Sequence, residues 1–392
     1  MDGPMSSPTA RMLNEFALTP LRMATAATNG WAHYVSTLPR SATPLDLNRD
    51  LLTWWRARSV RERPTWTHPN EVVREWPVAR LRDYSAPEPS CALPTLLLPP
   101  QAGHDSCIVD YAPGQSQLLT LREAGLDLLY TLDWAGASAA NLHATVEDYL
   151  AVVAETVQLV GGKVNLVGDC QGGWLAVLYT ALHPERVNTL TIAGAPVDFH
   201  AGESPLRDWT RLLGSAGRRG GAGEIALYRA MVEHSGGAQR GRSQVLGFKL
   251  LEPLAEWERD VALLAHIRDP EYVARHIEFT NWFEWTQDVP GGFYLWIVEH
   301  LFLNNELVTG ELVVGGLRVD LGLIECPLFL IAGTADHITP ADQVWALAQH
   351  VATPPESVHR ELVRGGHLGL FMGRESLRDH WAPLMRRVRA LS

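Results

Sequence analysis

The segment that most constrains the fold is a short apolar run, VNLVG at 164–168, that passes through Asp-Cys-Gln-Gly-Gly into a helix-forming stretch. Gly168 and Gly172 stand two residues before and two residues after Cys170. Side chains at those two positions would keep a strand and a helix from approaching each other closely. The segment therefore predicts a sharp strand–turn–helix with Cys170 at its tip.

Further apolar runs alternate with amphipathic stretches, which indicates a parallel sheet covered by helices on both faces. Residues 72–85 alternate with period two and predict an opening strand or hairpin. The predicted strands that follow are 94–100, 127–134, 164–168, 188–194, 327–333 and 359–363, and the predicted helices among them include 145–160 and 174–183.

The alternation of strands and helices divides the chain into three predicted parts. Residues 1–70 form an N-terminal helical extension, 71–200 and 306–392 form the α/β core, and 201–305 form a helical cap. Glycine-rich segments at 214–223 and 234–243 are expected to be mobile hinges or a lid of this cap. The plainer alternative is a helical subdomain packed by ordinary aromatic side chains.

Charge and cysteine content exclude several classes of protein. A formal net charge of -11 over 392 residues opposes binding to nucleic acid and to anionic membranes. The four cysteines form no CxxC pair and fit no common zinc motif, so no metal or cofactor is expected. No signal peptide is visible, and no apolar run reaches the about 18 residues of a membrane span. We expect a cytoplasmic protein.

Cys170 is the candidate nucleophile. At the tip of the turn its sulfur would face the N-terminus of the following helix, whose partial positive charge favours the thiolate. The backbone N–H of Gln171 would then be one donor of an oxyanion hole. The alternative is a buried structural cysteine in a glycine-rich turn, which is the interpretation favoured for Cys91, Cys107 and Cys326.

A thiol nucleophile needs a base and a carboxylate that orients it, and the chain supplies both in the order nucleophile, acid, base. Asp336 follows the apolar strand 327–333, and His367 lies in a glycine turn after the strand 359–363. Asp320 and Asp342 are rival acids. His337 is adjacent to the acid, so a supporting role is expected for it. The remaining candidate histidines are predicted in helices or at a strand start: His183, His350, His359 and His380.

The loop after the strand at 94–100 is expected to supply the other oxyanion donor. Gly103 and His104 lie there, where lipases and esterases carry an HG-type motif. The alternative for His104 is a loop residue that only hydrogen-bonds to neighbouring backbone.

The ordered set of motifs resembles the polyhydroxyalkanoate synthases, above all the short class III catalytic subunits, over about residues 70–392. The similar segments are GDCQGGWLAVLYTALHPERV with GAPVDF, DLLYTLDW, TVEDYLAVV, the stretch FLNNELVTG through TADHITP, and GGHLGLFMG. The resemblance implies an α/β-hydrolase fold with a mostly parallel sheet flanked by helices and a helical cap insertion. It also implies a Cys170–His367–Asp336 triad, a thioester-linked acyl-enzyme and 3-hydroxyacyl chemistry, with coenzyme A thioester as a possible substrate. Homodimers and association with polymer granules are further expectations.

One departure from that family lies near the site that must hold the acyl group. Synthases carry an Asn followed by a basic residue and tyrosines, where this chain has Ala-Gly-His-Asp-Ser at 102–106. A Gly-His there is more similar to intracellular polyhydroxyalkanoate depolymerases, whose nucleophile segment does not resemble the Cys-Gln-Gly-Gly of this chain. The chain also resembles hydrolase-like relatives within the α/β-hydrolase superfamily that carry a similar Cys-Gln-Gly-Gly-Trp segment. Three functions therefore remain open: a synthase-type acyltransferase, an esterase, thioesterase or depolymerase that uses water as acceptor, and a non-catalytic polymer-binding protein.

Overall fold

The computed structural model describes residues 8–219, 223–251 and 253–392. The chain forms two compact units, one made of residues up to Pro64 with Val245–Trp285, the other of Thr65–Gln244 with Thr286–Ser392. This division separates the predicted cap, 201–305, into two parts: residues 245–285 group with the N-terminal helices and the remainder with the α/β core. The role of the segment as a cap stays a prediction.

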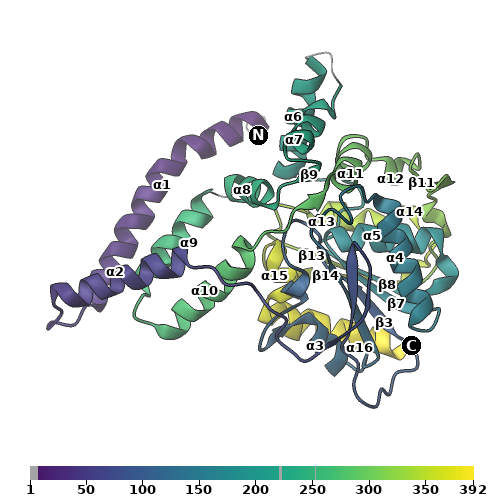
Figure 1. The fold of residues 1–392 in the computed structure, drawn as a ribbon, viewed down its shortest axis with the longest axis horizontal. Helices are drawn as coiled ribbons and strands as arrows, with labels where there is room; N and C mark the ends of the chain where they lie inside the picture. The colour runs from purple at the N-terminus through teal and green to yellow at the C-terminus, as the bar shows by residue number, and fades with distance from the viewer. Residues whose placement is uncertain (1–7, 220–222, 252) are drawn as a thin grey trace, which may run out of the picture. The chain divides into compact units, whose positions relative to one another are not determined.

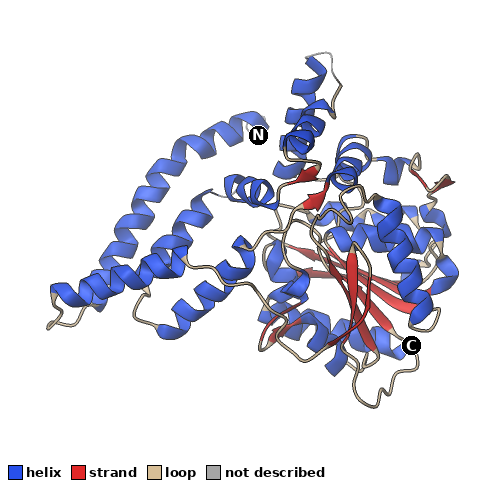
Figure 2. Cartoon of the chain, viewed as in Figure 1, coloured by secondary structure: helices blue, strands red, loops and turns tan. Residues whose placement is uncertain are grey.

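The second unit is built on one eight-stranded sheet, drawn in red in Figure 2. Strand β2 pairs antiparallel with both of its neighbours, and every other neighbouring pair is parallel. The predicted mostly parallel sheet is confirmed, and residues 72–85 form the hairpin that was one of its two options. In sheet order the strands are β1 (Glu71–Glu75), β2 (Ala79–Asp83), β6 (Leu129–Trp134), β3 (Thr95–Leu98), β7 (Val164–Asp169), β8 (Val187–Ala193), β13 (Leu328–Gly333) and β14 (Val358–Val363).

The central strands of this sheet are buried on both faces, which explains why β3, β7 and β13 read as apolar runs. Leu96 and Leu166 belong to the core that also holds buried residues of helices α4 and α5. Leu97 and Val167, one position along each strand, point to the opposite face and are equally buried. Figure 1 shows the helices of this unit around the sheet. Those outside the insertion are α3 (Gln117–Glu123), α4 (Val146–Leu159), α5 (Gln171–Leu182), α13 (Ala341–Trp345), α14 (Leu347–His350), α15 (His367–Met372) and α16 (Ala382–Ala390).

The insertion between β8 and β13 is largely helical. Its helices in the second unit are α6 (Pro205–Arg219), α7 (Ala226–His234), α11 (Gly291–Trp296) and α12 (Glu306–Thr309). Three small two-stranded sheets complete the unit: β4 (Asp110–Ala112) with β5 (Gln115–Ser116), β9 (Ala238–Gln239) with β10 (Val289–Pro290), and β11 (Val313–Val314) with β12 (Leu317–Arg318). Single turns of 3-10 or π-helix lie at Ser106–Val109, Pro184–Arg186, Ile297–Leu303, Leu321–Leu323, Pro355–Ser357 and Ser376–Trp381.

Aromatic stacking attaches α11 to the helices that cover the sheet. The ring of Phe293 stacks on that of Tyr149 in α4, with centroids 4.1 Å apart. Trp174 of α5 lies 6.0 Å from Phe293 and 5.9 Å from Trp296 by the same measure. The end of the insertion is therefore packed against the core helices by aromatic side chains.

The first of the two glycine-rich segments is partly helical, and its role as a hinge or lid stays a prediction. Residues 214–219 continue helix α6 rather than forming a loop, and 220–222 lie outside the described residues. Leu206, Trp209 and Leu213 repeat at the spacing of a helix face, and this apolar stripe outweighs the roughly 1 kcal/mol that a helical glycine costs. In the second segment, Gly236 and Gly237 have positive φ and turn the chain from α7 into β9.

The first unit is entirely helical in its described part. It contains α1 (Pro8–Thr37), α2 (Pro44–Ser59), α9 (Pro253–Ala265) and α10 (Pro270–Glu284), and α8 (Gly241–Leu251) begins in the second unit and ends in this one. Its small core comprises Tyr34, Ala57, Leu263, Ile267 and Val273. Helix α2 begins with a capping box between Thr43 and Asp46.

Candidate active site

Cys170 occupies the turn between β7 and α5 in a strained backbone conformation. Its φ is 48° and its ψ is -116°. Among the described residues, only Cys170 and Asn305 combine a side chain with positive φ. Such a conformation costs of order 1–3 kcal/mol and persists only where the surroundings enforce it. Here the N–H of Cys170 donates to the carbonyl of Ala193, 2.9 Å away, and its own carbonyl accepts from Gly173 at 3.0 Å.

The positions two residues before and two residues after Cys170 must be glycine, because there is no room for a side chain. A β-carbon on Gly168 would lie 2.5 Å from the carbonyl oxygen of Gly172, and one on Gly172 would lie 2.1 Å from that of Leu98. Real β-carbons do not approach backbone atoms so closely. The absence of these two side chains lets the start of α5 lie directly against the ends of β3 and β7.

Asp336 lies in the loop after β13 with both carboxylate oxygens engaged. Its Oδ1 accepts hydrogen bonds from the N–H groups of Ile338 and Thr339, at 3.0 and 2.8 Å. Its Oδ2 accepts from Nδ1 of His367 at 2.7 Å. Because an ionised carboxylate can only accept, His367 carries its proton on Nδ1 in this pair.

His367 is the first residue of α15 and is buried. With Nδ1 bound to Asp336, the other ring nitrogen, Nε2, is left for the hydrogen bond that joins the imidazole to Cys170. The ring is held from the sides as well: it meets Phe371 edge-on, with centroids 5.2 Å apart, and its Cε1 lies against Gly194 at the end of β8. Cys170, His367 and Asp336 thus form one hydrogen-bonded series across three loops of the same sheet edge.

The surroundings favour the charged imidazolium form of His367. Burial alone would lower the pKa of His367, but the charges of Asp336 and Cys170 and the hydrogen bonds to both raise it well above its ordinary value. The geometry therefore pairs Cys170 with a protonated imidazole that a carboxylate anchors. Such a pair can deliver a sulfur nucleophile and then return a proton to a leaving group.

The other predicted site residues lie as follows. Gln171 is the first residue of α5, where backbone N–H groups have no partner within the helix. Gly103 has a φ of 82°, and its carbonyl accepts from the N–H of Gln287 at 2.8 Å. His104 pairs with Thr286 in an isolated antiparallel bridge. The oxyanion roles of Gln171, Gly103 and His104 stay predictions.

The rival residues are placed differently. His337 is exposed, whereas its neighbour Asp336 is buried. Asp320 caps the turn at Leu321–Leu323 through a hydrogen bond from Gly322. Asp342 lies in the first turn of α13.

Motif reasoning did not single out two buried polar residues next to the nucleophile. Asp169 ends β7 and Gln117 begins α3, and Nε2 of Gln117 donates to Oδ1 of Asp169 at 3.2 Å. Burial raises the pKa of Asp169 to about 8, although Gln117 and the charge of His367 act to lower it. The one available signal was a carboxyl group at the end of an otherwise apolar buried strand.

The remaining cysteines differ from Cys170 in their surroundings. All four are free thiols. Burial raises the pKa of Cys107, and it raises that of Cys326 to about 12, so both stay protonated.

In the part of the chain that the structure describes, no group of His, Cys, Asp or Glu is arranged to hold a metal ion. No helix within that part is long and apolar enough to span a membrane.

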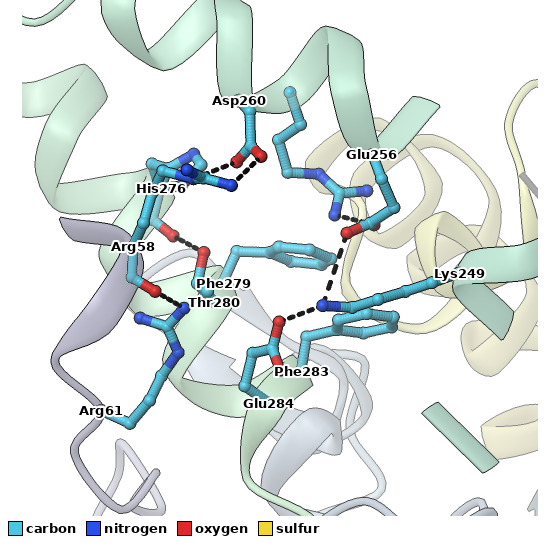
Figure 3. A pocket seen from close by; sticks show the side chains of 11 residues that line it. Arg58, Arg61, Lys249, Glu256, Asp260, His276, Phe279, Thr280, Phe283 and Glu284 are labelled. Atoms are coloured by element: carbon cyan, nitrogen blue, oxygen red, sulfur yellow. Dashed lines mark hydrogen bonds and ion pairs between the residues drawn. The ribbon is translucent and has the colours of Figure 1, made fainter. Parts of the chain in front are cut away.

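A separate pocket in the first unit offers different chemistry (Figure 3). Three of its four cations pair with its own carboxylates: Arg58 with Asp260, Lys249 with Glu284, and Arg259 with Glu256. Around these pairs lie Arg61, His276, Phe279, Thr280 and Phe283. The pocket contains no thiol and none of the predicted site residues. It is therefore a cavity lined mainly by ion pairs and is distinct from the candidate active site.

The packing at Gly172 predicts a severe and local defect. In Gly172→Ala the new methyl group meets the backbone of Leu98 and Pro99, which cannot move without displacing β3. We expect a loss of about 1–3 kcal/mol of unfolding free energy or more, measured by urea unfolding. Gly247→Ala, at an open helical position in α8, is the control and should be as stable as the wild type or more so. Equal stability of the two variants would contradict the described approach of α5 to β3.

The raised pKa of His367 predicts a pH-dependent stability. The folded state binds this proton more tightly than the unfolded state, whose histidine has the ordinary pKa of 6.5. Its contribution is therefore complete below about pH 6.5 and is lost as the pH rises through the folded-state pKa, at about 1.4 kcal/mol per unit of pKa difference. Asp336→Asn removes a charge that raises this pKa. We expect this variant to have a lower free energy of unfolding than the wild type at pH 6. The difference between the two proteins should become smaller as the pH rises.

Urea unfolding across this pH range checks that expectation. Asp320→Asn is the matched control, because Asp320 is exposed and caps a short turn. Its unfolding midpoint should follow that of the wild type at every pH. If the difference in unfolding midpoint between the wild type and Asp336→Asn becomes larger as the pH rises, the raised pKa assigned to His367 is contradicted.

Comparison with known proteins agrees with this fold. The chain is 29% identical over 338 residues to the poly(3-hydroxyalkanoate) polymerase subunit PhaC of Haloferax mediterranei, covering 83% of this chain and 65% of that protein. It is 27% identical over 280 residues to the subunit of the same name from Allochromatium vinosum, covering 69% of this chain and 74% of that protein. The chain thus spans less than two thirds of the Haloferax protein. The similarity to polyhydroxyalkanoate synthases that the motifs indicated is confirmed.

Among solved structures, the monoacylglycerol lipase of Paleococcus ferrophilus superposes with a TM-score of 0.50 at 16% identity, covering 80% of this chain and 99% of that one. The predicted α/β-hydrolase fold is confirmed. The model of the family described as "Protein of unknown function (DUF3141)" matches residues 90–372, a range that includes Cys170, Asp336 and His367. The match extends over more than half of the sequence, and the chain therefore belongs to the DUF3141 family.

Proposed function

We propose that this protein is an acyl-transfer enzyme that uses Cys170 as its nucleophile on 3-hydroxyacyl thioesters, in the manner of a polyhydroxyalkanoate synthase. The observation that carries the proposal is the hydrogen-bonded series from Asp336 through His367 to Cys170 at a strained turn. The similarity to two polymerase subunits supports the choice of acyl group. Cytoplasmic or granule location and a homodimer remain part of the proposal.

In the first half of the proposed reaction, the Cys170 thiolate attacks the carbonyl carbon of the acyl thioester. The negative charge that develops on the carbonyl oxygen is stabilised by the N–H of Gln171 at the start of α5 and by the loop of Gly103 and His104. The intermediate collapses as the carbon–sulfur bond to the leaving thiol breaks. His367 donates the proton on Nε2 to that thiol, which leaves a thioester on Cys170.

In the second half, the neutral His367 takes a proton from the acceptor hydroxyl as that oxygen attacks the Cys170 thioester. The bond to Cys170 breaks, and the thiolate forms again beside an imidazolium. Asp336 holds the ring through Nδ1 in both halves and stabilises its charged form. The acceptor is the hydroxyl end of a growing 3-hydroxyacyl chain, so each cycle lengthens the chain by one ester bond.

A second candidate function differs only in the acceptor. With water in place of the alcohol, the same residues would make an esterase, a thioesterase or a polyester depolymerase. The Gly103–His104 pair, in place of the synthase pattern, favours this alternative. A non-catalytic polymer-binding protein is disfavoured, because such a protein would have no need of a strained Cys170 hydrogen-bonded to a buried histidine.

Incubation with 3-hydroxybutyryl-coenzyme A separates these functions. We expect release of free coenzyme A thiol together with polymer or oligomer that sediments from solution. Thiol release with only free 3-hydroxybutyrate would contradict the synthase function and support the hydrolase. If neither thioesters nor esters are turned over, the acyl-transfer proposal is wrong.

Two variants of Cys170 test the nucleophile in the same assay. Cys170→Ala should abolish thiol release, because no sulfur remains to accept the acyl group. Cys170→Ser should also lose most activity, since a hydroxyl has a much higher pKa than a thiol and stays protonated beside His367. Wild-type rates in Cys170→Ala would show that Cys170 is not the nucleophile.

A further inference from the structure

Two buried polar side chains meet directly behind the nucleophile. Asp169 is the last residue of β7, immediately before Cys170, and Gln117 is the first residue of α3. Neither residue has any exposed surface. Nε2 of Gln117 donates to Oδ1 of Asp169 at 3.2 Å, a contact between residues 52 positions apart in the chain.

The remaining polar atom of each side chain is unsatisfied. Oδ2 of Asp169 and Oε1 of Gln117 are both buried and without a hydrogen-bond partner among the described residues. If Asp169 is ionised, both atoms are acceptors and neither can satisfy the other. A proton on Oδ2 turns one of them into a donor, so a carboxylic acid can give Gln117 a second hydrogen bond in return for the first.

Few charges act on Asp169 to offset its burial. Among the described residues, the imidazolium of His367 on α15 is the charged group that acts on Asp169, and Gln117 on α3 is its hydrogen-bond donor. Burial outweighs both and raises the pKa of Asp169 to about 8. Without a cation in contact, a fully buried carboxyl is held in its neutral form.

We propose that Asp169 is a neutral carboxylic acid at neutral pH, joined to Gln117 by two reciprocal hydrogen bonds, and that it acts as a positioning residue for Cys170. The pair fastens the start of α3 to the end of β7, one residue from the strained turn. Its neutrality also matters, since an ionised Asp169 would place a second carboxylate beside the thiolate and His367. The effect on the reactivity of Cys170 rests on the proposed function, in which Cys170 is the nucleophile. The protonation state of Asp169 does not depend on that proposal.

Asp169→Asn tests the protonation without any substrate. Asparagine has the shape of the neutral acid, and its Nδ2 can donate to Oε1 of Gln117. In the wild type the folded state keeps the Asp169 proton, while the unfolded state loses it at the ordinary pKa of 3.8. Raising the pH between these values therefore favours unfolding of the wild type, by up to tenfold in the unfolding constant per pH unit.

The measurement is urea unfolding of both proteins from about pH 5 to pH 9. We expect the wild-type midpoint to fall relative to that of Asp169→Asn up to about pH 8 and then to stay level. If the difference between the two unfolding midpoints stays constant, or if the wild-type midpoint rises relative to that of Asp169→Asn as the pH rises, Asp169 is ionised. An Asp169→Asn protein that does not fold would also overturn the proposal, because the proposed pair accepts an amide in place of the acid.

A second readout follows the thiolate itself. The rate at which iodoacetamide alkylates Cys170, followed by mass spectrometry of its peptide, reports the thiolate fraction at each pH. Below pH 8 we expect Asp169→Asn to match the wild type, because both carry a neutral group behind Cys170. Gln117→Leu, which leaves Asp169 in place but removes both hydrogen bonds of the pair, should slow the alkylation of Cys170, because the start of α3 is no longer fastened to the end of β7.

The two variants together decide the outcome. A shift of the Asp169→Asn profile to lower pH would show that a negative charge was removed, and the proposal would be wrong. A Gln117→Leu protein whose Cys170 is alkylated as fast as in the wild type would show that the pair does not hold Cys170 in place, which would overturn the positioning role. If no acyl substrate is turned over, the unfolding result still stands, so failure of the proposed function is distinguishable from failure of this inference.

Discussion

The close approach of α5 to the ends of β3 and β7 is the constraint on which the candidate site depends. Gly168 and Gly172 make it possible, because a β-carbon on either would collide with backbone. The approach forces Cys170 into a conformation that residues with side chains rarely adopt, and its hydrogen bond to Ala193 holds it there. The strain is tolerated because α5 is buried along almost its whole length. The position of one sulfur atom is thus fixed by packing throughout the centre of the α/β unit.

Electrostatics at this turn then follow from burial. A buried histidine is ordinarily neutral, yet His367 is flanked by Asp336 and Cys170, whose charges reverse that tendency. Asp336 can serve as a fixed anion because two backbone N–H groups hold its other oxygen. A further carboxylate in the same place would upset this balance. The neutral state proposed for Asp169 adds no further negative charge beside His367 and Asp336.

Local sequence patterns predicted most strands of the main sheet and the candidate site residues that follow them. The six strands predicted after residue 90 were found in the main sheet within one or two residues, since most of them are buried on both faces and read as apolar runs bounded by turns. Cys170, Asp336 and His367 were found in one hydrogen-bonded series because each lies at the end of such a strand. The order of the strands in the sheet fixes which of these ends meet.

Features that depend on contacts between distant segments were not predictable in the same way. The pairing of Gln117 with Asp169 joins two elements without a shared motif. The grouping of 245–285 with the N-terminal helices has no signature in composition. Helix α6 continues through glycines that indicated a hinge, because its apolar stripe outweighed their local preference.

The most direct test of the account is to trap the acyl-enzyme. Wild-type protein mixed with 3-hydroxybutyryl-coenzyme A, quenched in acid within the first turnovers and digested should carry the acyl group as a thioester on the peptide that contains Cys170. The same experiment with His367→Ala should give far less of this peptide, because the thiolate loses the imidazolium that stabilises it. Release of coenzyme A without any acyl group on Cys170, or an acyl group on another residue, would contradict the central claim.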